Sequence, residues 1–173
     1  MRPATVIATI LLTGCAPVTI DLVLPEDWER VPDAEDPFTD LRPDERSCDE
    51  AGVRVEEGVL EVDTLLCSWA TFRAPLPVDL ARNDEVTGLV FHGPLASVEP
   101  SEAVIIMAVG DVRVLDQTVD IPSPTALYEP ALVLEQEVSG DAWLHIHNHG
   151  GNDWRWTNLR VTSSRAAVRA LAD

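Results

Sequence analysis

The sequence predicts an all-β protein, an antiparallel β-sandwich of the jelly-roll type with about seven or eight strands. Apolar residues recur with a period of two from residue 53 to residue 163, which is typical of strands. No segment before residue 164 keeps a helical period over three turns. Turn-forming pairs such as Gly93-Pro94, Gly110-Asp111 and Ser139-Gly140 separate the apolar runs. Many short strands joined in this way favour two packed antiparallel sheets.

The expected strands follow one another through this region. Residues 60–63 alternate between apolar and acidic side chains, whereas residues 103–109 are continuously apolar, which indicates a strand buried on both faces. The full set of expected strands is residues 60–63, 67–72, 86–91, 103–109, 112–121, 132–138, 142–147 and 159–161. The Ala-rich end, residues 164–173, fits either a short helix or a frayed tail.

Residues 15–47 differ in composition from the predicted sandwich domain, residues 48–163. Acidic residues crowd between prolines that recur at positions 17, 25, 32, 37 and 43. Such a composition buries little apolar surface and predicts an extended acidic tether. Val18, Ile20, Leu22 and Leu24 alternate with other residues, however, so part of this segment also fits an edge strand docked on the domain.

A short apolar run at residues 4–13 follows Arg2 and ends just before Cys15. A membrane-spanning helix needs ~20 apolar residues, so the run predicts a secretory signal, residues 1–14, that is removed. The alternative is an ordinary secretory signal, or a mispredicted start, that ends near a cysteine by chance.

The tetrad Leu12-Thr13-Gly14-Cys15 closely resembles the lipobox of bacterial lipoproteins. The resemblance implies that Cys15 becomes the first mature residue and carries acyl chains such as palmitate, which hold a protein on a membrane. In Gram-negative lipoproteins an Asp after the cysteine favours the inner membrane, and Ala16 stands there instead. We therefore expect a lipid-anchored protein of the cell envelope, at the outer membrane, with a domain facing the periplasm or the surface.

Cys48 and Cys67 are the remaining thiols once Cys15 is lipidated. Outside the cytoplasm an even pair of cysteines is typically bridged. Their spacing matches no zinc ribbon. We expect a structural disulfide that contributes about 3 kcal/mol to stability by closing the loop between them.

The charge balance excludes several classes of function. Acidic residues number 30 against 12 basic ones, all of them arginine, for a net charge of −18. Such a field repels phosphate backbones, so nucleic-acid binding is not expected. The chain contains no Gly-x-Ser-x-Gly motif and no Gly-rich phosphate loop, and nothing in it indicates an enzyme.

Three of the four histidines fall within residues 143–149. Because alternate strand residues share a face, Leu144 and Ile146 are expected to point into the core and the histidines to point outward. A His-x-His pair on a strand can hold zinc or copper. The candidate metal ligands are His92, His145, His147 and His149. In the alternative interpretation these imidazoles are outward-facing polar residues without a ligand.

The same segment also fits a glycan platform, since flat aromatic rings stack on sugar faces and amides and imidazoles bond hydroxyl groups. The Gly-x-Asn-x-Trp segment at residues 150–154, followed by residues 159–161, resembles the galactose-binding-like jelly rolls, an architecture shared by many carbohydrate-binding modules. Candidate ligand-binding residues are Trp143, His145, His147, His149, Asn152 and Trp154. In the alternative interpretation the tryptophans are core residues and residues 150–152 form a simple turn.

These observations predict a lipid-anchored envelope protein with a non-catalytic binding role, its partner being a glycan, the cell wall or another protein. A metal-binding envelope protein built on the histidine strand is the second interpretation, with zinc or copper as the only expected cofactor. The third is a purely structural lipoprotein.

Overall fold

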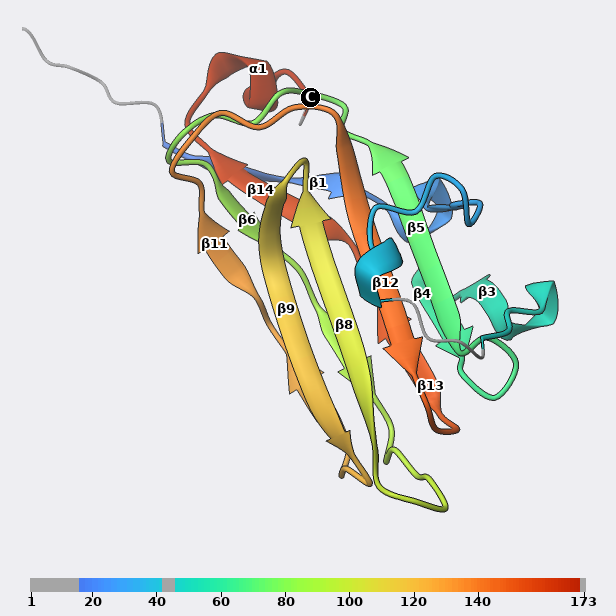
Figure 1. The fold of residues 1–173 in the computed structure, drawn as a ribbon. Coiled ribbons are helices and arrows are strands. Elements are labelled where there is room, and N and C mark those ends of the chain that lie inside the picture. The colour runs from blue at the N-terminus through green and yellow to red at the C-terminus, as the bar shows by residue number, and fades with distance from the viewer. Residues whose placement is uncertain (1–15, 42–45, 172–173) are drawn as a thin grey trace, which may run out of the picture.

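The computed structural model describes residues 16–41 and 46–171 (Figure 1). The predicted signal, residues 1–14, and the predicted lipidation site Cys15 lie outside the described residues. Within the described ranges, no helix is long and apolar enough to cross a membrane.

The chain folds into two packed β layers, which confirms the predicted antiparallel all-β sandwich. The front layer is one antiparallel sheet of five strands in the order β2-β5-β12-β8-β9. Its strands are β2 (Glu29–Arg30), β5 (Trp69–Pro75), β12 (Asp141–Asn148), β8 (Ser101–Val109) and β9 (Val112–Ile121).

The back layer consists of two half-sheets. Three chain segments, each broken into two consecutive strands, pass from one half into the other and join them. The β14 half has the order β1-β14-β6-β11, with β1 (Val18–Val23), β14 (Leu159–Ser163), β6 (Glu85–Thr87) and β11 (Ala131–Val133). The β13 half has the order β10-β7-β13-β4-β3, with β10 (Ala126–Tyr128), β7 (Val90–His92), β13 (Asp153–Trp156), β4 (Val59–Asp63) and β3 (Val53–Glu56). In Figure 1, β6, β11 and β14 lie behind β8 and β9.

The breaks between the two halves explain why the strands are more numerous and shorter than expected. The expected strand 86–91 is interrupted at Gly88, where a Cβ atom would lie 2.8 Å from the side chain of Met107 in the front layer. Pro130 separates β10 from β11, because proline has no N–H to continue a ladder. The expected strand 132–138 is shorter than predicted and forms only β11, which ends at Val133.

A single hydrophobic cluster fills the space between the layers. Leu144 and Ile146 of β12 are 0% exposed and face inward, as the alternation predicted. From the back layer, Val161, Trp154 and Trp156 are also 0% exposed. Burial of side chains this large is the main source of stability for a domain of this size.

The N-terminal segment is part of the sandwich, which begins at Val18 and not at residue 48. Strand β1 pairs with β14, with Ile20 opposite Val161, and β2 pairs with β5. The alternating Ile20 and Leu22 bury their side chains, 8% and 5% exposed, and Pro25 begins the helix that follows β1. Residues 18–41 are therefore docked on the domain and do not form the predicted tether. Hydrogen-bonded pairing of β1 and β2 with the two layers offsets the acidic composition of the segment.

Residues 31–41, here called the strap, cross the outer face of the front sheet. In Figure 1 the short helix η2 (Thr39–Leu41) lies in front of β12. Val31 N donates to Thr71 O at 2.8 Å, and the Phe38 side chain is buried at 7% exposure. Asp36 accepts a hydrogen bond from Trp69 Nε1 at 3.0 Å and another from Phe38 N at 2.9 Å. The strap therefore covers this face over β5 and β12, and the outer face of β9 stays exposed.

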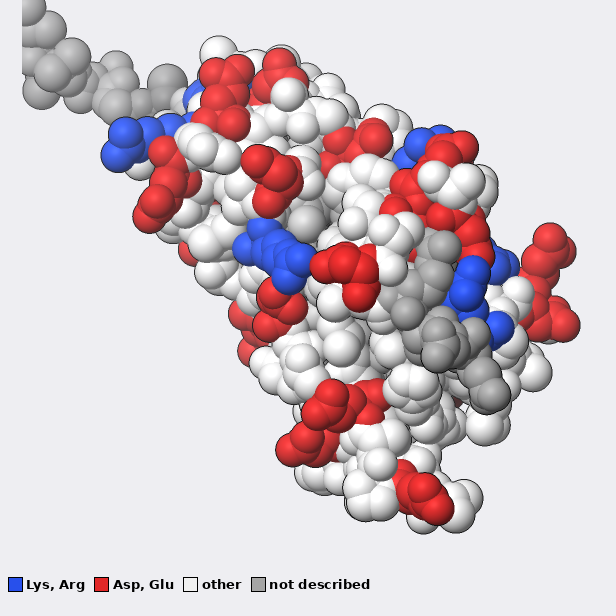
Figure 2. All heavy atoms as spheres, in the orientation of Figure 1, with Lys and Arg blue, Asp and Glu red and all other residues white. Residues whose placement is uncertain are grey.

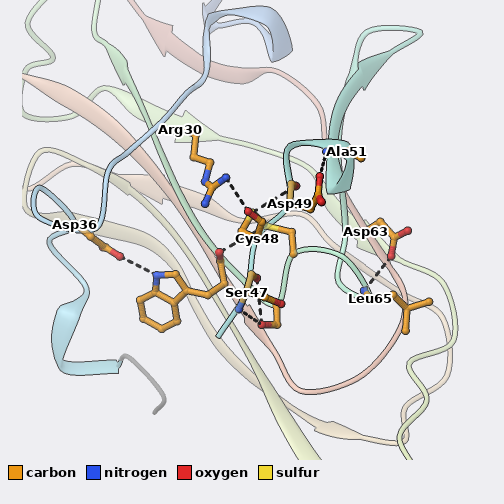
Figure 3. Close-up of a disulfide and its surroundings, with 11 residues drawn as sticks. Arg30, Asp36, Ser47, Cys48, Asp49, Ala51, Asp63 and Leu65 are labelled. Atoms are coloured by element: carbon orange, nitrogen blue, oxygen red, sulfur yellow. Dashed lines mark hydrogen bonds between the residues drawn. A yellow bond between two sulfur atoms is a disulfide. The ribbon is translucent and has the colours of Figure 1, made fainter. Parts of the chain in front are cut away.

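The predicted disulfide between Cys48 and Cys67 is confirmed (Figure 3). Around it, Ser47 N donates to Ser68 Oγ at 3.2 Å and Arg30 donates to Cys48 O at 3.2 Å. The bridge joins the chain between η3 (Glu50–Gly52) and the strap to the turn before β5.

Short helices form near both ends of the described chain. Near the N-terminus a short helix, η1 (Pro25–Asp27), follows β1. At the C-terminus α1 (Ala166–Arg169) buries Val168 at 0% exposure, so the helix is the alternative that forms.

Candidate functional site

The strap changes the role of the predicted histidine strand. His145 points outward from β12, as predicted, but it is 0% exposed beneath the strap. Its ring centroid lies 5.0 Å from that of Phe38 and 4.4 Å from that of Trp69, and its Nδ1 bonds Thr71 Oγ1 at 2.8 Å. Burial lowers the pKa of His145 to about 3, so the ring is neutral at physiological pH. His145 is a packing residue and is not accessible to a ligand.

His147 and His149 come together at the exposed end of β12. Their Nε2 atoms lie 2.8 Å apart and their ring centroids 4.4 Å apart. Burial, and then the neighbouring His149, lower the pKa of His147 to about 4. His149 is exposed and lines an open groove of ≈ 890 Å³ with Ser68, Asn148 and Gly150.

The other predicted metal ligand, His92, lies on the inner face of the back layer. It is 0% exposed, its ring centroid is 4.5 Å from that of Trp154, and Nδ1 donates to Gly93 O at 2.6 Å. The four histidines therefore do not converge. In the parts of the chain that the structure describes, no three His, Cys, Asp or Glu side chains are placed to hold a metal ion.

The predicted glycan platform is also dispersed. Trp154 is 0% exposed, so its ring is part of the core and cannot stack on a sugar. The Asn152 side chain is used within the fold, donating to Pro94 O of another loop and accepting from Asp153 N at 2.6 Å. Trp143 is half-buried on the outer face of the front sheet, opposite Arg73. Spacing placed Trp143 on an outward face, but it placed neither Asn152 nor Trp154, and it does not reveal which face is covered.

The outer face of the back layer, here called the back face, is exposed and carries two rows of side chains. The first row crosses the β14 half and contains Ala131, Thr87, Arg160 and Asp21 on neighbouring strands. The second row crosses the β13 half and contains Leu127, Phe91, Arg155, Glu61 and Arg54. Both rows point away from the core, because Val86, Val161 and Trp154 take the alternate positions.

Between the rows lies a hollow of ≈ 530 Å³, at the level where the three segments break. Its polar lining comes from two hydroxyl groups, an amide, a carboxylate and a guanidinium, which belong to Thr87, Thr157, Asn158, Glu129 and Arg160. Gly88 and Pro130, where two of the segments break between strands, also line the hollow, and Gly88 N donates to Pro130 O at 3.2 Å.

Ion pairs hold the side chains on the β14 side of the hollow in place. Arg160 Nε donates to Asp21 Oδ1 at 2.8 Å. A hydrogen bond from Asn158 and the pairing with Arg160 lower the pKa of Asp21, against the opposing effect of burial. Asp21 therefore stays ionised and holds both the amide of Asn158 and the guanidinium of Arg160, two residues that line the hollow.

The second row is ordered by Glu61, whose side chain is only 8% exposed between two arginines. Arg155 Nε donates to Glu61 Oε2 at 2.6 Å, and Arg54 pairs with the other oxygen. The bond to Glu61 raises the pKa of Arg155, and the same guanidinium lies 5.9 Å from the ring centroid of Phe91. Phe91 is a half-buried aromatic ring on this face.

No protein-family model matches this chain, and no curated protein matches it. Among solved structures, a mutant of a carbohydrate-binding module of family 29 aligns with 84% of this chain and 92% of its own, at 7% identity and a TM-score of 0.46. A carbohydrate-binding module described for specific mannan recognition aligns with 85% and 98%, at 11% identity and a TM-score of 0.46. A cleaved adhesin domain of Lys-gingipain from Porphyromonas gingivalis aligns with 84% and 99%, at 9% identity and a TM-score of 0.47. Likeness at this level identifies neither a family nor a ligand for this chain.

The sequence interpretation missed the hollow and its two rows. The alternation around Val86 and Val161 already placed Thr87 and Arg160 on an outward face. What it lacked was the strand order, because Asp21, Asn158 and Glu129 are far apart in the sequence and meet only through pairing in the back layer.

Proposed function

We propose that this protein is a non-catalytic glycan-binding protein and that a neutral glycan binds in the hollow on the back face. The observation that carries the proposal is the lining of the hollow. It offers hydroxyl, amide, carboxylate and guanidinium groups together in ≈ 530 Å³. Sugar hydroxyls both donate and accept hydrogen bonds, so such a mixed set of donors and acceptors suits them.

The charges of the back face favour a neutral ligand over an ionic one. Arg160 is paired with Asp21, and Arg54 and Arg155 with Glu61, so each of these cations already has an anion. The net charge of −18 adds a repulsion against polyanions. Phe91 lies in the adjacent row and offers an apolar ring edge for a pyranose.

Isothermal titration of the purified full-length chain with soluble neutral polysaccharides tests this proposal. Asn158→Ala and Arg160→Ala are each expected to weaken binding about tenfold, the equivalent of one or two hydrogen bonds. Arg113→Ala is the matched control, because Arg113 is an equally exposed arginine paired with Asp116 in the front layer. Binding that survives both back-face variants, or that falls equally in the control, would contradict the proposal.

We further propose that Cys15 anchors the protein at the cell envelope, on the strength of the lipobox resemblance. In that case Cys15→Ser moves the protein from the detergent phase to the aqueous phase in phase partitioning. Wild-type protein recovered in the aqueous phase would remove the anchor.

A further inference from the structure

The imidazole pair at the end of β12 has a geometry that packing alone does not require. The Nε2 atoms of His147 and His149 are 2.8 Å apart, their ring centroids 4.4 Å apart, and their planes are inclined at 68°. Two imidazoles joined by a straight N–H···N bond of this length would have their centroids about 5 Å apart. The observed centroid distance is shorter, so at least one ring is tilted away from the line that joins the two nitrogen atoms.

The two distances match those of one coordination geometry. Two nitrogen ligands at about 2.0 Å from one ion and in adjacent corners of a square are about 2.8 Å apart, with ring centroids about 4.4 Å apart. In a tetrahedral site the two nitrogens would be about 3.3 Å apart. The square-planar or tetragonal arrangement is the preference of Cu²⁺, whereas Zn²⁺ prefers the tetrahedral one.

The surroundings of the pair allow an ion to bind. His149 is exposed and lines the open groove of ≈ 890 Å³ at the end of the sandwich. The net charge of −18 raises the local concentration of cations. His145 is excluded from the pair because its Nδ1 bonds Thr71 and its ring lies beneath the strap.

We propose that His147 and His149 chelate one Cu²⁺ ion through their Nε2 atoms at the end of the front sheet. The two imidazoles fill adjacent corners of the coordination square, and solvent or a ligand in the groove fills the others. Since no third metal-binding side chain stands beside the pair among the described residues, the ion remains accessible from outside. The site is on the opposite layer from the hollow, so it is independent of glycan binding.

Titration of the full-length chain, purified without a polyhistidine tag, with Cu²⁺ tests the proposal. One equivalent is expected to bind, with an electron paramagnetic resonance spectrum of a tetragonal Cu²⁺ ion coupled to two nitrogens. His147→Gln and His149→Gln are each expected to lower the affinity at least about tenfold, since loss of even an orienting partner can cost that much. Zn²⁺ is expected to bind more weakly than Cu²⁺.

Glu102→Gln is the matched control. Glu102 is an exposed acid on β8 whose backbone oxygen accepts from His149 N at 3.4 Å, so the variant removes a nearby charge and keeps both imidazoles. Unchanged Cu²⁺ binding in this control supports the proposal. A spectrum with oxygen ligands alone, or an unaltered affinity in His149→Gln, would overturn it. Because His149 is exposed, its replacement leaves the fold in place, which circular dichroism checks.

Discussion

Burial, more than spacing, decides the role of each histidine in β12 and directly after it. His145 and His149 lie four residues apart in one segment, but the first is sealed beneath Phe38 and the second is exposed. The sealed ring is held neutral, with a pKa of about 3. Burial is the main cause, His147 and Arg113 add to the lowering, and Asp36 opposes it.

This neutral ring makes stability depend on pH. In the unfolded chain an imidazole has a pKa of about 6.5, so below that pH the unfolded state binds a proton that folded His145 does not bind. The free energy of unfolding therefore falls as the pH drops from 6.5 toward 3. At pH 5, His145 accounts for about 2 kcal/mol of the loss.

Urea unfolding of the wild type and of His145→Gln at pH 7 and pH 5 measures this effect. The variant is expected to lose about 2 kcal/mol less than the wild type between the two pH values. His149→Gln replaces an exposed imidazole on the same segment and serves as the control. An identical loss in wild type and His145→Gln would show that the imidazole is not sealed.

The strap covers β5 and β12 on the outer face of the front sheet. Phe38 is 7% exposed and packs its ring 5.0 Å from that of His145. Phe38→Ala is expected to destabilise the fold by about 3 kcal/mol and to let water reach His145. The pKa of His145, followed by NMR, should then rise toward 6.5. Thr39→Ala, an exposed change in the next residue, should leave both quantities unaltered, and a pKa that stays near 3 in Phe38→Ala would contradict this role.

Strand β1 tests whether the N-terminal segment belongs to the domain. Ile20 is 8% exposed and faces Val161, whereas its neighbour Thr19 is exposed and bonds the Thr162 hydroxyl at 2.8 Å. Ile20→Asp buries an unpaired carboxylate and is expected to cost about 3 kcal/mol or more in thermal unfolding. Thr19→Asp, on the outer face, is expected to cost little. Equal melting temperatures for the two variants would return residues 18–24 to the role of a tether.

The elements also show how far the sequence could predict this structure. Local pattern was sufficient for β8, from its continuous apolar run, and for β9 and β12. Alternation also gave the inward direction of Leu144 and Ile146, because side-chain period is a property of the strand itself. The cover over His145 and the hollow beside Asn158 depend on segments distant in sequence, and a period contains no information about them. Pro37 and Pro43 favoured a tether, although Phe38, which lies between them in the sequence, packs its side chain against His145 of the front sheet.

The outer faces of the two layers differ in how far they are exposed to solvent. The strap covers the front sheet over β5 and β12, where His145 is 0% exposed, whereas the outer face of β9 is exposed. Figure 2 shows that acidic side chains are distributed over this side of the molecule. The back face is open, and its charges are paired within ordered rows. A surface that is exposed, polar and internally neutralised is suited to a neutral ligand, which is why the proposed glycan site lies there and not on the histidine strand.

The disulfide stabilises the molecule as a whole, because it links two segments that meet beside the strap. Cys48 and Cys67 are 19 positions apart, and the loop between them contains β3 and β4 of the back layer. In the chain-entropy account a bridge over such a loop contributes about 3 kcal/mol by restricting the unfolded chain. The Cys48→Ala/Cys67→Ala double variant should therefore unfold at a lower urea concentration, with a free energy of unfolding about 3 kcal/mol smaller. Its slope should be steeper than that of the wild type, because the unfolded chain without the bridge is less compact. Reductant should bring the wild type to the stability of the variant and leave the variant unaffected. A wild type whose midpoint does not change under complete reduction would contradict this account.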